Sequence, residues 1–163
     1  MKYFFVTAAL IIFISNSFSQ TTRYRDSIFS AIETTTVVFG ANLDYHDVMD
    51  TLRADIYQPQ QDDDTARAMI IYVHGGGFVK GTRNDSSIQA LCRKLTARGY
   101  VTATIDYRIG ISDHQQVSGL INASLRAVQD LNAFIRFAKT NAAQLKIDTN
   151  KIFIAGSSAG GIT

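Results

Sequence analysis

The chain has 163 residues, of which 46% are hydrophobic and 18% are charged, so it is long and apolar enough to form the core of one ordinary domain. Its formal net charge is only +2, and the basic residues are scattered along the sequence. This pattern argues against nucleic acid or an anionic membrane surface as the main partner and favours a small or uncharged substrate.

The first nineteen residues differ from the rest of the chain. Lys2 supplies a positive charge, residues 3–14 form an almost uninterrupted apolar run, and residues 17–19 (SFS) have the small-x-small form of a cleavage site. The run of about 12 residues is shorter than the roughly 20 that cross a bilayer, so we expect no stable membrane span. We therefore predict a signal peptide over residues 1–19 and export to the periplasm or the extracellular space, with an uncleaved anchor as the alternative.

Cysteine and histidine are too sparse to indicate a disulfide, a metal site or a bound cofactor. The only cysteine, Cys92, lies among apolar residues at helical spacing and is expected to be a buried structural thiol. His46, His74 and His114 show no metal-ligand spacing. The aspartates at 62–64 lack the alternating ligands of a calcium loop, so they predict a solvated turn.

The predicted elements follow in chain order. Residues 20–33 are polar and weakly patterned, and they lead into a domain predicted over residues 34–163. β-branched and alternating patterns predict two antiparallel strands, at 34–39 and 52–57. Continuous apolar runs predict buried strands, at 68–73, 100–105 and 151–155. Helical spacing predicts two helices, at 85–98 (ending at Gly99) and at 117–140.

The longer of the two predicted helices carries one apolar stripe and one pair of opposite charges. The stripe consists of Leu120, Ser124, Ala127, Val128, Leu131, Phe134, Ile135 and Ala138. Arg126 and Asp130 lie four residues apart, so an ion pair between them is predicted. A buried role for Asp130 against a neighbouring loop is the alternative.

Strands that alternate with helices after an antiparallel hairpin predict an α/β fold. Buried strands joined by helices form a mostly parallel sheet with helices on both faces. Right-handed crossovers place the carboxyl ends of these strands at one edge, where open α/β sheets bind ligands. The glycine-rich segments after Val73 and after Ala155 are both expected at that edge.

Residues 156–160 (GSSAG) match the pattern G-x-S-x-G, with Ser158 at its centre. In that pattern a tight strand-to-helix turn holds the serine in strained backbone angles, and side chains two residues to either side would collide. A phosphate-binding glycine turn is the alternative. The segment lacks the lysine of a P-loop and the spacing of a dinucleotide fingerprint.

Residues 74–78 (HGGGF) form the second candidate site segment. Ester hydrolysis passes through an oxyanion that backbone N–H groups must stabilise, and glycines let the backbone approach closely. We expect Gly75 and Gly76 to donate, together with Ala159 directly after the serine. A flexible glycine turn is the alternative. His74 is interpreted as a residue that shapes the loop and not as the catalytic base.

Together, HGGGF, the DYR of residues 106–108 and the GSSAGG that begins at residue 156 resemble the α/β-hydrolase serine esterases, in particular the hormone-sensitive-lipase-like and type-B carboxylesterase-like groups. The resemblance covers about residues 35–163 and corresponds to the N-terminal half of that fold. It implies strand order 1-2-4-3-5, Ser158 as nucleophile, and residues 106–108 as a brace near the HGGGF loop. Ser157 departs from the acidic residue or histidine of many relatives.

The other members of a catalytic triad are expected beyond the end of this chain. In this fold the acid and then the histidine follow the serine, whereas only five residues follow Ser158, none of them acidic or histidine. His46 and His114 lie in a hairpin and a connecting loop and are not expected to substitute. Without the remaining elements, residues 152–154 should form an uncovered apolar edge, so residues 20–163 expressed alone are predicted to be poorly soluble.

The predicted function is carboxylic ester hydrolysis through an acyl-enzyme, with a small-molecule or polymer-borne ester as substrate. This fragment alone is expected to be inactive. A serine peptidase of the same fold and a non-catalytic, hydrolase-like binding domain are the alternatives. The sequence makes no prediction about oligomeric state.

Overall fold

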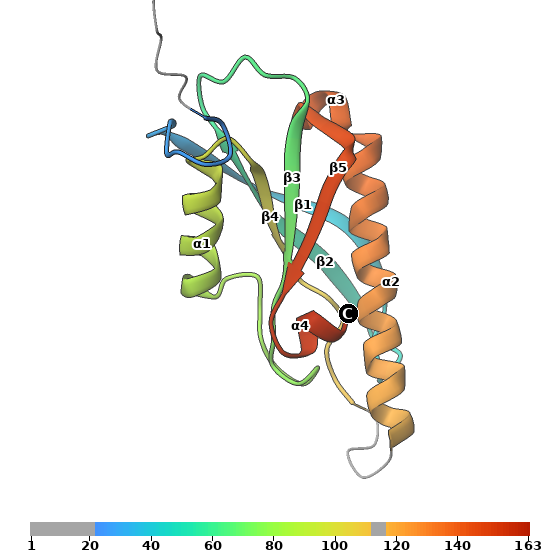
Figure 1. Cartoon of the computed structure of the whole chain (residues 1–163). Helices are drawn as coiled ribbons and strands as arrows, with labels where there is room; N and C mark the ends of the chain where they lie inside the picture. Colours follow the sequence, from blue (N-terminus) through green and yellow to red (C-terminus); the bar gives the residue numbers. More distant parts are fainter. Residues whose placement is uncertain (1–21, 112–116) are drawn as a thin grey trace, which may run out of the picture.

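The computed structural model describes residues 22–111 and 117–163. Its elements are β1 (Ile32–Leu43), β2 (Met49–Pro59), β3 (Arg67–Val73), α1 (Ser86–Thr96), β4 (Val101–Ile105), α2 (Val117–Thr140), α3 (Ala142–Leu145), β5 (Ile147–Gly156) and α4 (Ala159–Ile162) (Figure 1). The predicted signal peptide and His114 lie outside the described residues. Among the helices in the described ranges, none is long and apolar enough to cross a membrane.

The five strands form one sheet in the order β1-β2-β4-β3-β5, which is the predicted order. β1 and β2 pair antiparallel, as do β2 and β4. β3 pairs parallel with both β4 and β5, so these three strands end at the same edge, the lower one in Figure 1. The predicted fold class, a hairpin followed by a parallel α/β sheet, is confirmed.

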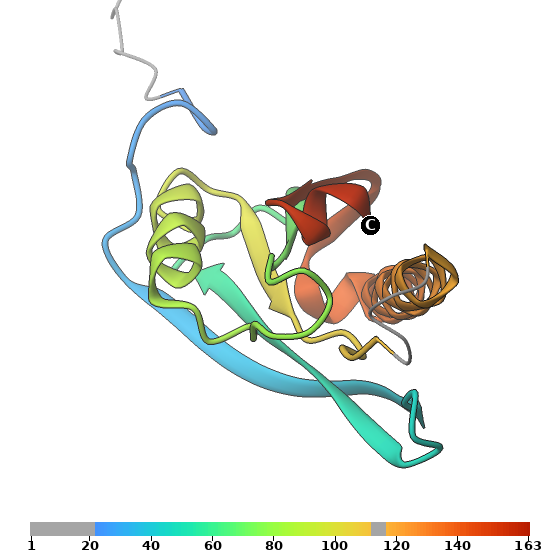
Figure 2. The same cartoon turned by 90° about the horizontal axis from the view of Figure 1, so that it is seen from below.

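The helices α1 and α2 cover opposite faces of the sheet (Figure 2). On one face, Ala103 and Ile105 of β4 join the core that includes Phe134 of α2. On the other face, the hydroxyl of Thr102 lies 3.3 Å from the carbonyl oxygen of Cys92 in α1. Cys92 is buried, as predicted, and burial raises the pKa of its thiol to about 11.

Several element boundaries differ from the prediction. The hairpin strands β1 and β2 extend to 32–43 and 49–59, because they pair along their whole length with one irregularity between Val38 and Gly40. The helix α1 is capped by the carboxylate of Asp85 and ends at Thr96, two residues before the predicted end. Gly99 follows it at φ +97°. The short helix α3 was not predicted, since four residues give no periodic pattern.

The bounds of α2 match the prediction, but its buried stripe differs in the first half. Leu120 is 46% exposed, and Gly119 and Ala123 are buried in its place. This half of the helix packs against the segment after β4. The guanidinium of Arg126 donates a hydrogen bond to the carbonyl oxygen of Gly110 in that segment. Small residues therefore face the protein there, while the buried stripe of the second half, at Leu131, Phe134 and Ala138, includes two large side chains.

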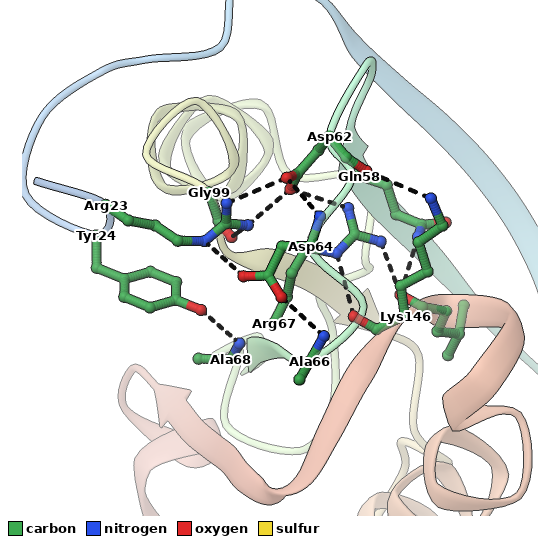
Figure 3. A network of polar contacts seen from close by, with 11 residues as sticks. Arg23, Tyr24, Gln58, Asp62, Asp64, Ala66, Arg67, Ala68, Gly99 and Lys146 are labelled. Carbon is green, nitrogen blue, oxygen red and sulfur yellow. Dashed lines mark hydrogen bonds and ion pairs between the residues drawn. The ribbon is translucent and has the colours of Figure 1, made fainter. Parts of the chain in front are cut away.

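The aspartate turn is only partly the solvated turn that was predicted, because Asp63 is exposed whereas Asp62 is buried. The side chain of Asp62 is only 4% exposed and lies between two arginines, Arg23 at 2.6 Å and Arg67 at 3.5 Å (Figure 3). Arg23 also contacts Asp64, at 3.2 Å. The leading segment before β1 is thus fixed to the amino end of β3. Sequence reasoning missed the contact because Arg23 and Asp62 are 39 residues apart.

The strand β5 lies at the edge of the sheet. Its residues Phe153 and Ile154 are 54% and 52% exposed. The apolar run at 151–155 is therefore not buried on both faces but forms the uncovered edge that was expected for this stretch of chain.

Candidate active site

Ser158 stands at the turn between β5 and α4, where the sequence placed the candidate nucleophile. Its backbone angles are φ +52° and ψ −118°, a region that residues with a side chain rarely adopt. Holding a non-glycine residue there costs roughly 1–3 kcal/mol, which the surrounding structure must offset. The residue is exposed, so its hydroxyl is accessible from solvent.

The two glycines that flank Ser158 are required by close backbone contacts. A Cβ atom on Gly156 would lie 2.1 Å from the carbonyl oxygen of Gly160. A Cβ atom on Gly160 would lie 2.1 Å from the carbonyl oxygen of Val73 at the end of β3. These are collisions of the kind predicted for the pattern, and they show that the turn is packed directly against the neighbouring strand.

The HGGGF loop meets this turn at the carboxyl edge of the sheet. A Cβ atom on Gly75 would lie 2.9 Å from the carbonyl oxygen of Ser157 and 3.3 Å from the Cβ of Ser158, so the two backbones are in contact. Gly76 has φ +121°, and a Cβ there would lie 1.9 Å from the carbonyl oxygen of Lys80. The structure therefore brings together the two glycine-rich segments, as the order of elements predicted.

Three amides at this junction are available to a ligand. The N–H groups of Gly75, Gly76 and Ala159 donate to no other residue within the described ranges. Backbone N–H groups that converge without internal acceptors form the kind of concavity that binds anions. A backbone N–H group without an internal acceptor is able to donate to negative charge that develops beside it.

The histidines of the described chain do not hydrogen-bond to Ser158. His74 is 2% exposed and stacks on Tyr107, with ring centroids 4.3 Å apart, while its Nδ1 lies 2.7 Å from the carbonyl oxygen of Gly75. This position agrees with its interpretation as a residue that shapes the loop. His46 stacks on Tyr45 in the turn between β1 and β2, at 3.8 Å.

The segment after β4 braces the loop through Asp106. Its carboxylate accepts hydrogen bonds from the backbone N–H of Arg83, at 3.0 Å, and from the Arg83 guanidinium, at 2.6 Å. Arg83 also pairs with Asp55 of β2 at 3.1 Å. Burial acts to lower the pKa of Arg83, and its two carboxylate partners outweigh that effect and raise it. Arg83 was not identified from the sequence, because no local pattern marks its partners.

Arg108 and Asp130 form a buried ion pair beneath this segment. Their side chains are 4% and 3% exposed, and the Nη2 of Arg108 lies 2.8 Å from the Oδ1 of Asp130. The predicted pair between Arg126 and Asp130 is therefore wrong, because Asp130 points inward to Arg108 while Arg126 bonds to the carbonyl of Gly110 at 2.6 Å. The alternative, a buried role for Asp130 against a neighbouring loop, is confirmed.

An open pocket of 520 Å³ adjoins both glycine-rich segments. Gly75, Gly76 and Ser157 contribute to its lining, together with polar side chains that include Lys80 and Thr82. The pocket thus reaches Ser157, the residue before the candidate nucleophile, whereas Ser158 itself is not among its lining residues.

Comparison with known proteins places these features in a family. Residues 54–162 match the family model BD-FAE. The chain is 34% identical over 93 residues to the esterase LipC of Mycobacterium tuberculosis, covering 57% of this chain and 21% of LipC.

Solved structures of esterases share the fold. The native form of the thermophilic esterase Est2 of Thermogutta terrifontis superposes with a TM-score of 0.61 at 29% identity, covering 78% of this chain and 41% of that one. The form of that esterase phosphorylated by paraoxon gives a TM-score of 0.61 at 26% identity, covering 78% of this chain and 44% of that one. The chain thus spans less than half the length of these relatives, and it belongs to the BD-FAE family of α/β-hydrolase esterases.

Proposed function

We propose that the protein containing this chain hydrolyses carboxylic esters through an acyl-enzyme formed on Ser158. The observation that carries the proposal is the strained backbone of Ser158, held in contact with Gly75. Strain of this kind recurs where a side chain must be presented to a reaction. Membership of an esterase family supports the same chemistry.

In the proposed mechanism the hydroxyl oxygen of Ser158 attacks the ester carbonyl carbon. The carbonyl oxygen becomes an oxyanion that accepts hydrogen bonds from the N–H groups of Gly75, Gly76 and Ala159. Collapse of the tetrahedral intermediate expels the alcohol and leaves the acyl group on the serine, and a water molecule then releases the acid.

A serine hydroxyl needs a neighbouring base, which takes the hydroxyl proton during this attack and gives it to the departing alcohol. Neither described histidine hydrogen-bonds to Ser158. We propose that the base and its acidic partner belong to chain that follows residue 163, in the order acid and then histidine. We also propose that residues 1–19 direct export, which would place small-molecule or polymer-borne esters outside the cytoplasm within reach of the enzyme.

The experiment is kinetic and uses the full-length protein encoded by the gene. Ser158→Ala should lower kcat for p-nitrophenyl acetate by about 10⁴-fold or more, because the acyl-enzyme is not formed. Ser124→Ala is the matched control, since the hydroxyl of this serine on α2 donates to the carbonyl oxygen of Ile121 in its own helix. An unchanged kcat in Ser158→Ala would refute the proposal. A parallel assay with a dipeptide p-nitroanilide separates an esterase from a peptidase of the same fold.

A further inference from the structure

The two donors on the HGGGF loop are coupled to carbonyl groups on their far side. A trans peptide unit is planar, so the C=O of one residue and the N–H of the next point in opposite directions. The described peptide bonds are all trans. The N–H of Gly75 therefore shares a plane with the C=O of His74, and the N–H of Gly76 shares a plane with the C=O of Gly75.

Both of these carbonyl groups are held by a side chain. The hydroxyl of Tyr107 donates to the carbonyl oxygen of His74 at 2.9 Å. The Nδ1 of His74 lies 2.7 Å from the carbonyl oxygen of Gly75. A carbonyl oxygen only accepts hydrogen bonds, so Nδ1 carries the hydrogen in this contact. Each peptide plane is thus fixed from the side opposite to its N–H.

The side chains that hold the two planes are themselves immobilised. His74 and Tyr107 are 2% and 3% exposed, and their rings stack with 19° between the planes. Burial raises the pKa of Tyr107 to about 12, so its hydroxyl stays protonated and able to donate. Gly81 has φ +110°, and a Cβ there would lie 2.4 Å from both Nδ1 of His74 and the carbonyl oxygen of Gly75, so the chain closes directly over the bond.

We propose that His74 and Tyr107 are positioning residues that aim the N–H groups of Gly76 and Gly75 at the oxyanion by holding the opposite carbonyls. The inference rests on the proposed esterase function. In this role the two side chains help to stabilise the transition state, in addition to holding the loop in its folded conformation. Donors stabilise a developing charge best when they are already oriented before the reaction, because no reorganisation is then needed.

The first test removes one hydroxyl from the full-length protein. Tyr107→Phe keeps the stacked ring but releases the carbonyl of His74. We expect kcat for p-nitrophenyl acetate to fall about tenfold with KM within about twofold, since the interaction lost is made in the transition state. The control is Tyr57→Phe, which removes the hydroxyl of a tyrosine that is also fully buried but packs in the cluster with α1. It should leave both constants unchanged.

The second test uses a transition-state analogue and a rescue variant. An aryl trifluoromethyl ketone adds to the serine and forms an oxyanion, so its affinity should fall in Tyr107→Phe by the same factor as kcat/KM. His74→Ala should lower kcat and the affinity for the ketone, because the N–H of Gly76 is then no longer held in its orientation. His74→Asn retains an N–H near the position of Nδ1 and should recover most of the lost rate.

The outcomes separate this inference from the proposed function. Retained activity in Ser158→Ala defeats the function itself. If Ser158→Ala is inactive but Tyr107→Phe binds the ketone as tightly as the parent and keeps its kcat, the function stands and the positioning role is refuted. Equal rates for His74→Asn and His74→Ala in folded protein would also refute it, because a purely structural histidine predicts no rescue by an N–H group.

Discussion

The buried pair between Arg108 and Asp130 allows a stability effect to be worked out from the structure. The carboxylate of Asp130 pairs with the guanidinium of Arg108 at 2.8 Å. It also accepts a hydrogen bond from the backbone N–H of Arg108, at 2.8 Å. Asp130→Ala removes these interactions together and leaves a buried guanidinium. The partners that remain are neutral: the carbonyl oxygens of Leu43 at 2.9 Å and of Arg126 at 3.5 Å, and the side-chain oxygen of Gln129 at 3.0 Å.

Removing one member of a buried ion pair costs about 3–5 kcal/mol, because the remaining charge stays desolvated without a counter-charge. We therefore expect Asp130→Ala to lose about 3–5 kcal/mol of unfolding free energy at pH 7. The double variant Arg108→Met/Asp130→Leu removes both charges and should be less destabilised than Asp130→Ala, since no buried charge is left.

The assay is urea unfolding of the full-length protein at pH 7, followed by circular dichroism. The control is Asp148→Ala, which removes a partner of the exposed Lys151 at 3.0 Å and should leave the midpoint unchanged within error. A loss below about 1 kcal/mol in Asp130→Ala would show that Arg108 finds solvent or another partner, and the described packing after β4 would then be wrong.

Three further predictions concern the turn, the N-terminal ion pair and the exposed sheet edge. Gly160→Ala should abolish esterase activity and lower the yield of folded protein in a size-exclusion assay, because its Cβ would lie 2.1 Å from the carbonyl oxygen of Val73; a fully active variant would contradict the packing. Burial acts to raise the pKa of Asp62, but Arg23, the backbone N–H of Asp64 and Arg67 together outweigh it and hold the pKa below its usual value. The stabilisation is thus present at neutral pH and lost as the pH falls through the folded-state pKa, so Arg23→Gln should lower Tm more at pH 7 than at pH 3, and an equal Tm loss at both pH values would argue against the pair. Residues 20–163 expressed alone should be recovered mainly in the insoluble fraction, and a monomer with a cooperative melt would contradict this.

The sequence was sufficient for the order of the elements and for the meeting of the two glycine-rich segments. Apolar runs such as 68–73 mark strands, and the short helical connections leave few topologies. The strain at Ser158 also follows from the pattern, because the G-x-S-x-G motif holds its serine on a sharp, strained strand-to-helix turn. These features are determined by residues close together in the sequence, so they can be predicted from local sequence patterns.

Apart from the short helix α3 and the element boundaries, the features that sequence reasoning missed depend on distant partners. Asp130 was paired with Arg126 by helical spacing, but the buried Arg108 competes for it from another segment. Asp62 was placed in solvent, although Arg23, which lies before the first strand, covers it. Leu120 faces solvent although it belongs to the apolar stripe. The small residue Ala123 is buried instead, in the half of α2 whose Arg126 donates to the carbonyl oxygen of Gly110 in the loop after β4. Charges and apolar side chains find such partners only once the chain is folded.

The central claim is that the hydroxyl of Ser158 is the reactive nucleophile. We propose to treat the full-length protein with paraoxon, the reagent that phosphorylates the related Thermogutta terrifontis esterase, and to locate the adduct by peptide mass spectrometry. We expect one diethylphosphoryl group on Ser158, formed at the same rate as esterase activity is lost. Complete loss of activity with the adduct on another residue, or an active esterase that paraoxon never labels at Ser158, would contradict it.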